Sequence, residues 1–327
     1  MSFVHECFQF MDEHGLGVSN ESKIKHNGDI ERYTVKKDKK GSLNGWMIYR
    51  NDLKPSCTFG SWKTGECVTW FAEDIRDLPK SEQQRIKKEL MESRVRASRL
   101  RDEEVRQQRI KSSQEALRMW NGASDLMIDL REHQYVKSKQ IIPYMAKLED
   151  STGCLIIPML NQDNRLSSIQ RIYPNGRKLF LSGGGIQNCF VTLDEETKDN
   201  NKHVFICEGW ATGCTLHEIT KSDVVVCYNA NNLDTVTAIT KMRYPDSDIF
   251  ICADNDHQTI ISGVPTNVGE IKANEASQKH GVSVIYYGTD EHGTDWNDYH
   301  TIKGIDDASA WFGFRMDATI KGEPEYV

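Results

Sequence analysis

The strongest constraint on the fold is an alternation of apolar and helix-forming segments in the C-terminal part of the chain. Apolar segments at 204–207, 224–228, 249–253 and 282–287 are separated by helical segments near 212–220, 233–244 and 268–280. Strands that alternate with helices in this way are typical of a parallel sheet with helices on its faces. We therefore predict an α/β fold for this part of the chain.

Three acidic residues come directly after two of the predicted strands. Glu208 follows the strand at 204–207, and Asp254 and Asp256 follow the strand at 249–253. Ligands bind beyond the carboxyl ends of parallel strands, and neighbouring strands lie about 4.8 Å apart, so these carboxylates can meet around one cation. Carboxylate oxygens without His or Cys suit Mg²⁺ or Mn²⁺. Gly209 would let a phosphate approach the backbone closely.

A second acidic pair, Asp295 and Asp298, follows the last predicted strand. These residues could reach the same sheet edge and help to hold the metal. The alternative is an Asn/Asp-rich surface turn without a ligand.

The preceding 200 residues divide into three further segments, and the chain is long enough for several compact units. Residues 1–72 form a small N-terminal α+β unit, because short strand patterns at 31–35, 45–50 and 57–59 are separated by turn residues. Residues 73–132 are a long charged helical connector, and residues 133–199 are a basic β-rich subdomain. Residues 200–327 are the α/β domain with a short C-terminal tail from Asp306.

The connector and the aromatic residues of the N-terminal unit each allow two interpretations. Residues 80–120 contain twelve basic and seven acidic residues and no Gly or Pro. They can form a solvated connector helix or a positive rod that contacts nucleic-acid backbone. Trp46, Tyr49, Trp62 and Trp70 can stack on single-stranded bases, but aromatic residues of a small β unit more often form its core.

The pattern of the acidic residues resembles a known family. Glu208-Gly209, followed after one strand and one helix by Asp254-x-Asp256, is similar to the Toprim domain of bacterial primases, topoisomerases and some nucleases. The longer strings 207–217 and 253–256 resemble the phage and plasmid primases in particular. Residues 155–158 and 177–180 resemble the basic subdomain that precedes Toprim in bacterial primases, and 41–46 and 59–65 resemble the N-terminal segment of plasmid- and phage-borne Toprim proteins.

This resemblance implies a primase that synthesises short RNA primers on a single-stranded DNA template from ribonucleoside triphosphates by two-metal-ion catalysis. Glu208, Asp254 and Asp256 would be the catalytic residues. The nucleotide or the nucleic acid would contact the following residues: Arg171, Arg177, Lys178, Gly209 and Lys272. A separate helicase or replication initiator is an expected partner.

Two other functions stay open at this point. A Toprim nuclease would use the same carboxylates to cleave phosphodiesters, and a non-catalytic accessory protein could keep the fold and bind nucleic acid.

Composition excludes several classes of protein. The nine cysteines form no C-x-x-C pair, so we expect buried reduced thiols and no zinc ribbon. Because no apolar run approaches the roughly 20 residues of a membrane span and the N-terminus does not resemble a secretory signal, we expect a cytoplasmic protein.

Overall fold

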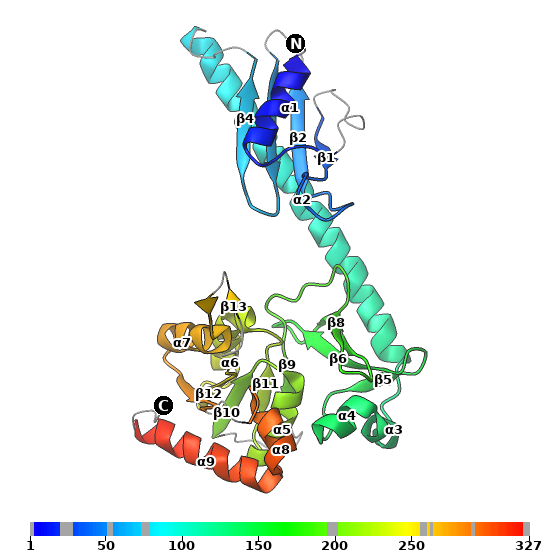
Figure 1. Ribbon diagram of the computed structural model, residues 1–327, viewed down its shortest axis with the longest axis vertical. Coiled ribbons are helices and arrows are strands. Elements are labelled where there is room, and N and C mark those ends of the chain that lie inside the picture. The colour runs from blue at the N-terminus through cyan, green and yellow to red at the C-terminus, as the bar shows by residue number, and fades with distance from the viewer. Residues whose placement is uncertain are drawn as a thin grey trace. The chain divides into compact units, whose positions relative to one another are not determined.

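The computed structural model describes residues 3–19, 29–50, 55–72, 79–194, 202–255, 260–261, 264–288 and 292–322. The chain forms two compact units, residues 1–104 and 105–327 (Figure 1). None of the described helices is both long enough and apolar enough to cross a membrane.

The N-terminal unit is built on an antiparallel sheet in which strands follow one another in chain order. Its strands are β1 (Glu31–Tyr33), β2 (Gly45–Arg50), β3 (Ser56–Ser61) and β4 (Cys67–Phe71). Helix α1 (Phe3–Glu13) contributes Cys7, Phe8 and Met11 to the core of this unit. The sequence patterns identified three of the four strands, and α1 and β4 are additions.

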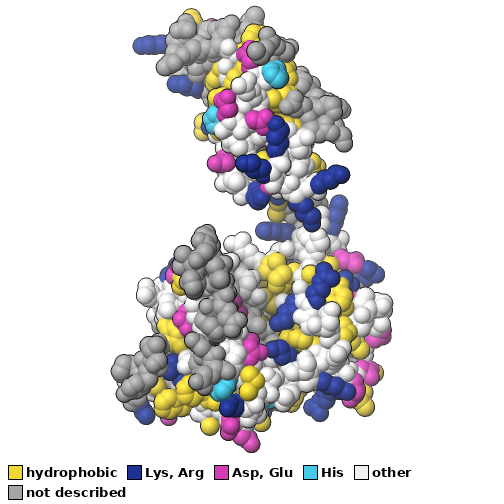
Figure 2. All heavy atoms as spheres, viewed as in Figure 1, with side chains coloured by type: hydrophobic (Ala, Val, Ile, Leu, Met, Phe, Trp, Pro, Cys, Tyr) yellow, Lys and Arg dark blue, Asp and Glu magenta, His cyan; other side chains and the backbone are white. Residues whose placement is uncertain are grey.

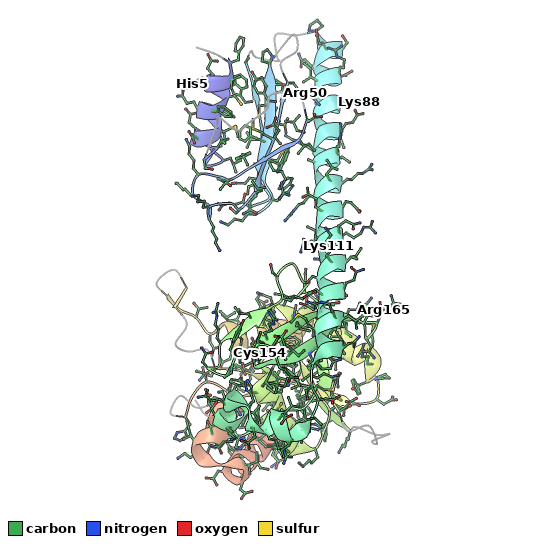
Figure 3. The ribbon with its side chains drawn as sticks, turned by 90° about the vertical axis from the view of Figure 1, so that its right-hand side faces the viewer. His5, Arg50, Lys88, Lys111, Cys154 and Arg165 are labelled. Atoms are coloured by element: carbon green, nitrogen blue, oxygen red, sulfur yellow. The ribbon has the colours of Figure 1, made fainter. Side chains whose placement is uncertain are left out.

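Helix α2 (Lys80–Gly122) forms one 43-residue helix, as its composition predicted. Most of its charged side chains extend from the ribbon, and Lys88 and Lys111 are labelled in Figure 3. Small residues mark where it packs. In the N-terminal unit, Ala97 contacts Trp46 and Ile48, and in the C-terminal unit Ala116 contacts Ile156 and Ile169.

The C-terminal unit begins with an antiparallel sheet of order β5-β6-β7-β8. Its strands are β5 (Lys147–Glu149), β6 (Cys154–Leu160), β7 (Leu166–Ile172) and β8 (Lys178–Phe180), preceded by α3 (Met127–Glu132) and α4 (Gln134–Lys139). Side chains of β6 alternate between two cores: Leu155 and Ile157 face the large core of the unit, and Ile156 faces the end of α2.

A second sheet has the order β15-β12-β10-β11-β9, with β9 antiparallel and the other described strands parallel. Its strands are β9 (Val191–Leu193), β10 (His203–Cys207), β11 (Val224–Val226), β12 (Asp248–Ala253) and β15 (Ser283–Tyr286). The chain also forms a short hairpin, β13 (Ile260–Ile261) and β14 (Val264–Pro265). The predicted α/β fold is therefore confirmed, with an antiparallel edge strand that the sequence patterns did not identify.

Helices cover both faces of this sheet (Figure 1). One face carries α5 (Trp210–Thr220), α8 (Trp296–Lys303) and α9 (Ile305–Lys321), and the other carries α6 (Leu233–Arg243) and α7 (Val268–His280), with a 3₁₀ turn at Ala230–Asn232. Because side chains of a strand point alternately to opposite faces, Phe205 and Cys207 join the first core and Val204 and Ile206 the second. Both faces are buried, which explains the nearly continuous apolar strands of the sequence.

The segment that the sequence suggested to be a short tail is instead helix α9. Phe312 is buried against Phe205 and Trp296, and Trp311 Nε1 donates to the carbonyl of Tyr287. The expectation of a tail was wrong because the apolar face of this helix is short and broken by charged residues. The four-part division of the chain stays a prediction.

All nine cysteines are free, and all except Cys67 are buried. The predicted burial is confirmed for eight of the nine thiols, and their reduced state stays a prediction.

Candidate functional site

Glu208 and Asp254 lie at the carboxyl ends of adjacent parallel strands. The strand register places Ile206 of β10 beside Ile251 of β12, so Glu208 and Asp254 follow the two strands at the same edge of the sheet. The chain leaves β10 toward β11 on one side and returns to β12 on the other side of β10. This reversal of direction is the place where ligands bind in open α/β sheets.

Electrostatics places the two carboxylates near one buried thiol. Burial raises the pKa of Cys227 well above its ordinary value, and the negative charges of Glu208 and Asp254 both raise it further. Burial and the charge of Asp254 also raise the pKa of Cys252. Both carboxylates thus act on Cys227, the residue that directly follows β11.

The third predicted ligand, Asp256, lies outside the described residues. Within the described ranges, no group of three or more His, Cys, Asp or Glu side chains is placed to hold a metal ion. The roles predicted for Glu208, Asp254 and Asp256 therefore stay predictions, although the first two share one sheet edge.

Asp295 and Asp298 are neither in a loose turn nor isolated. Asp295 is the N-cap of α8, where it accepts a hydrogen bond from the Asp298 amide at 2.8 Å. Asp298 accepts from the amide of Thr294 at 3.1 Å and forms an ion pair with Lys139 of α4, with 2.9 Å between Nζ and Oδ1. The backbone N–H of Asn255, next to Asp254, donates to the Thr294 carbonyl at 2.8 Å. This hydrogen bond connects the segment of Asp295 and Asp298 to the sheet edge at Asp254.

The pKa values of this pair shift in opposite directions. Burial raises the pKa of Asp295, and the charge of Asp298 adds to the shift. Burial also acts to raise the pKa of Asp298, but hydrogen bonds from Lys139 and Thr294 outweigh it and lower that pKa. The pKa of Lys139 rises because Asp298 and Asp295 outweigh its own burial. Lys139 is therefore the cation that neutralises this pair in the structure.

Gly209 and Thr212 connect the second acidic pair to Glu208. Gly209 is the N-cap of α5, and a Cβ at this position would lie 3.0 Å from Thr212 Oγ1. The Thr212 hydroxyl in turn donates to the Asp295 carboxylate, which moderates the rise of its pKa. A residue larger than Gly would crowd the first turn of α5, where its unpaired backbone N–H groups begin.

The predicted phosphate-binding cations differ in how they are held. Arg171 is bound by Glu149 of β5, with 2.7 and 2.9 Å from Nη2 to the two carboxylate oxygens. Arg177 is exposed beside Tyr173, and Lys272 pairs with Glu275 on the exposed side of α7. Of these residues, Arg171 is therefore already paired with an acidic residue of its own sheet.

Among the predicted cations, Lys178 is linked to the acidic edge through contacts with aromatic side chains. Its Nζ lies 5.6 Å from the ring centroid of Tyr135, and that ring stacks on Trp210 at 6.5 Å. Trp210 directly follows Glu208 and Gly209, and the charges of Asp295 and Asp298 act on the Tyr135 hydroxyl. The antiparallel sheet thus presents a cation one aromatic layer from the start of α5.

Sequence reasoning missed Lys139, Tyr135 and Thr212 at this site. An N-cap was detectable, since Asp295 with an acidic residue three positions later resembles a capping box. Nothing local indicates the ion pair of Lys139, because its partner lies 159 residues away in the chain.

Comparison with known proteins supports the resemblance. Residues 203–306 match the family described as Toprim domain. The chain is 24% identical over 286 residues to a DNA primase TraC of Escherichia coli, covering 86% of the chain, and 26% identical over 263 residues to a second TraC of the same organism, covering 80%. These matches span only 19% and 24% of the length of the relatives.

Solved structures with a similar arrangement are also primases. The primase fragment of the bacteriophage T7 primase-helicase is 14% identical, with a TM-score of 0.38, covering 56% of this chain and 70% of that one. A DNA primase domain from Pseudomonas aeruginosa is 14% identical, with a TM-score of 0.35, covering 52% of this chain and 56% of that one. The sequence comparisons thus show a match of residues 203–306 to the Toprim domain and similarity of most of the chain to a part of the TraC primases.

Proposed function

We propose that this Toprim-containing chain is a primase core that synthesises short RNA primers on single-stranded DNA. The observation that carries the proposal is the position of Glu208 and Asp254 at one edge of the sheet within the matched Toprim segment. Homology to TraC primases supports primer synthesis as the reaction. Because the chain spans a fifth to a quarter of those relatives, the activity is a proposal for this chain.

The residues at this edge fit a hard divalent cation. Carboxylate oxygens gather there, and the nearby Cys207, Cys227 and Cys252 are buried thiols whose pKa values burial raises well above the ordinary range, which disfavours the thiolate that zinc requires. Glu208 and Asp254, together with Asp256, would hold Mg²⁺ or Mn²⁺. Such a metal, when bound, would neutralise a triphosphate and activate the 3′-hydroxyl of the growing primer.

Other residues of the chain would position the nucleotide. The N-terminus of α5 presents backbone N–H groups beside Gly209, where a phosphate can approach because no Cβ intervenes. Lys178, which lies on the antiparallel sheet, would contact a phosphate. Arg177, the residue before it, is also exposed. Asp295 and Asp298 would shape this edge through Lys139 rather than act as a separate metal site.

Labelled ribonucleotides, single-stranded DNA templates and Mg²⁺ or Mn²⁺ test the proposal directly. We expect wild-type protein to form short labelled RNA, a chelator to stop the reaction, and either cation to restore it. Glu208→Gln and Asp254→Asn, which keep the side-chain shape, should abolish synthesis. Asp248→Asn is the matched control, because Asp248 is exposed and begins the same strand that Asp254 follows.

The same assay separates the alternatives. If the template is labelled as well, its cleavage without primer formation would favour a Toprim nuclease. Primer synthesis by Asp254→Asn at the wild-type rate would contradict the site, and template binding without any metal-dependent reaction would indicate an accessory protein. A separate helicase or replication initiator stays a proposed partner, to be tested by stimulation of primer synthesis.

A further inference from the structure

The N-terminal unit carries an exposed lysine-rich turn between β1 and β2. Lys36, Lys37, Lys39 and Lys40 are all exposed and surround Asp38. Two successive β-turns form the segment: the Asp38 amide donates to the Val35 carbonyl, and the Ser42 amide donates to the Lys39 carbonyl, each at 2.9 Å. Gly41 has a φ of +83°, which the third position of a type II turn requires.

Asp38 fixes this turn to the rest of the unit. Its carboxylate accepts from Lys63 Nζ at 2.5 Å and from Asn44 Nδ2 at 3.3 Å. The hydrogen bond from Lys63 lowers the pKa of Asp38, so the carboxylate stays charged at neutral pH. The lysines around Asp38 are therefore held on an ordered backbone.

A groove with a volume of about 580 Å³ lies beside this turn. Its lining includes three basic side chains and two hydroxyl groups, contributed by Arg32, Lys36, Lys40, Ser19 and Thr34. Leu43, which is 46% exposed, adds an apolar wall. Figure 2 shows Lys and Arg side chains along the lower part of this unit and also at its upper left.

Arg32, which lines the groove, and Arg101 both lie against the ring of Trp62. Arg32 donates from Nη2 to the Leu43 carbonyl at 2.9 Å, and its guanidinium carbon lies 5.0 Å from the ring centroid of Trp62. Arg101 of α2 lies 5.5 Å from the same centroid. Trp62, which is only partly buried and stacks on Trp46, thus orients two guanidinium groups.

The positive charge around the groove exceeds the negative charge. Three ion pairs compensate part of it: Lys36 with Asp12, Lys63 with Asp38, and Arg32 with Glu104. In the described part of the chain, Lys37, Lys39 and Lys40 form no ion pair. Three exposed, uncompensated cations on an ordered turn would attract a polyanion.

We propose that this groove and lysine-rich turn bind the phosphates of single-stranded nucleic acid, independently of the Toprim site. Arg guanidinium groups match the geometry of phosphate and of carboxylate, and the partly exposed Trp62 and Leu43 can contact an unpaired base, which favours a nucleic acid over an acidic peptide. The preference for a single strand rests on the proposed primase function, whose template is single-stranded. The unit would thus hold template while synthesis takes place at the other unit.

Fluorescence anisotropy of labelled oligothymidylate with the full chain, in a chelator and without nucleotides, tests this binding apart from catalysis. The triple variant Lys37→Gln, Lys39→Gln, Lys40→Gln should bind about tenfold to a hundredfold more weakly at 0.1 M salt, and the slope of log K against log salt should become shallower by about 2. The matched control Lys202→Gln, Lys303→Gln, Lys321→Gln removes three exposed charges from the other unit and should bind like wild type.

Three results would decide against the proposal. Superimposable salt titrations for the triple variant and the wild type, with equal thermal melting, would show that the lysines make no phosphate contact. Displacement of the oligonucleotide by polyglutamate as effectively as by unlabelled oligothymidylate would indicate a site for an acidic protein. Equal loss in the control variant would indicate a general charge effect. Asp254→Asn should bind the oligonucleotide normally, because the two sites are independent. A wild-type chain that binds the oligonucleotide but forms no primer would overturn only the proposed function.

Discussion

Lys139 Nζ lies 2.9 Å from Asp298 Oδ1, and this ion pair joins α4 to the first turn of α8. Both side chains are partly buried, with 27% and 30% of their surfaces exposed. Asp298 also accepts the Thr294 amide, and Asp295 caps the same helix. The pair therefore holds the segment before the antiparallel sheet against the acidic edge of the parallel sheet.

We predict that Lys139→Met lowers the free energy of unfolding of the C-terminal unit by about 1–3 kcal/mol, because it leaves a partly buried carboxylate beside Asp295. Asp298→Asn should cost less, and the double variant should be more stable than the sum of the single changes implies. Urea denaturation of the four proteins measures the coupling energy. Strictly additive losses would show that the two residues do not interact.

Arg171 and Lys178 should separate binding from stability. Lys178 is exposed, so Lys178→Ala should weaken template or nucleotide binding and make its salt dependence shallower without lowering the melting temperature. Arg171→Ala removes the partner of Glu149, whose side chain is only 14% exposed, and should cost about 1–3 kcal/mol of folding free energy. Salt titrations and melting curves of both variants check this. Unchanged stability of Arg171→Ala would leave Arg171 as a phosphate-binding residue only.

We predict that His133 makes the C-terminal unit less stable at acidic pH. It is buried, its Nδ1 accepts from the Tyr135 amide at 3.3 Å, and its Nε2 contacts the Gly153 carbonyl at 3.0 Å. Burial lowers its pKa, so the unfolded chain takes up a proton near pH 6.5 before the folded chain does. The contribution of His133 to the free energy of unfolding is therefore fully present above about pH 6.5. It falls as the pH decreases toward the lower pKa of the folded state.

His133→Asn keeps a helix-capping acceptor and removes the titrating group. We expect a smaller difference between the unfolding free energies at about pH 7.5 and pH 5.5 than in the wild type. His5→Asn, at an exposed position of α1, is the control and should leave the difference unchanged. An equal pH dependence in wild type and His133→Asn would contradict the assignment.

The sequence predicted those parts of the structure that depend on local pattern. The helix predicted near 268–280 coincides with α7, because Gly281 directly follows its last residue. Glu208 and Asp254 were found because each follows a buried strand directly. Strand β9 was missed because three residues give no periodicity, and it joins the sheet by pairing with β11.

Long-range relationships were not predictable in this way. Arg171 was predicted to contact phosphate, yet Glu149, 22 residues earlier, binds it on the same face of the sheet. The aromatic residues divide similarly: Trp46, Tyr49 and Trp70 are buried in the N-terminal unit, as expected for a β core, whereas Trp62 is partly exposed beside two arginines. One sequence pattern thus covers two environments that only the fold separates.

Two glycines within helices should respond in opposite ways to substitution by Ala. A Cβ at Gly213 of α5 would lie 2.5 Å from Val226 Cγ2 and 3.2 Å from Cys207 Sγ, so α5 would have to move from the sheet beside Glu208. At Gly313 of α9, a Cβ would meet no atom within 4 Å. Ala is favoured over Gly in a helix by about 1 kcal/mol at either position, but overpacking of a buried site costs about 1–3 kcal/mol.

We therefore expect Gly313→Ala to raise the free energy of unfolding by up to about 1 kcal/mol and Gly213→Ala to lower it. Because Gly209 is the N-cap of the displaced helix, Gly213→Ala should also reduce primer synthesis. Chemical denaturation and the primer assay measure both effects, and a stabilised, fully active Gly213→Ala would show that the contact between α5 and the sheet is looser than these distances indicate.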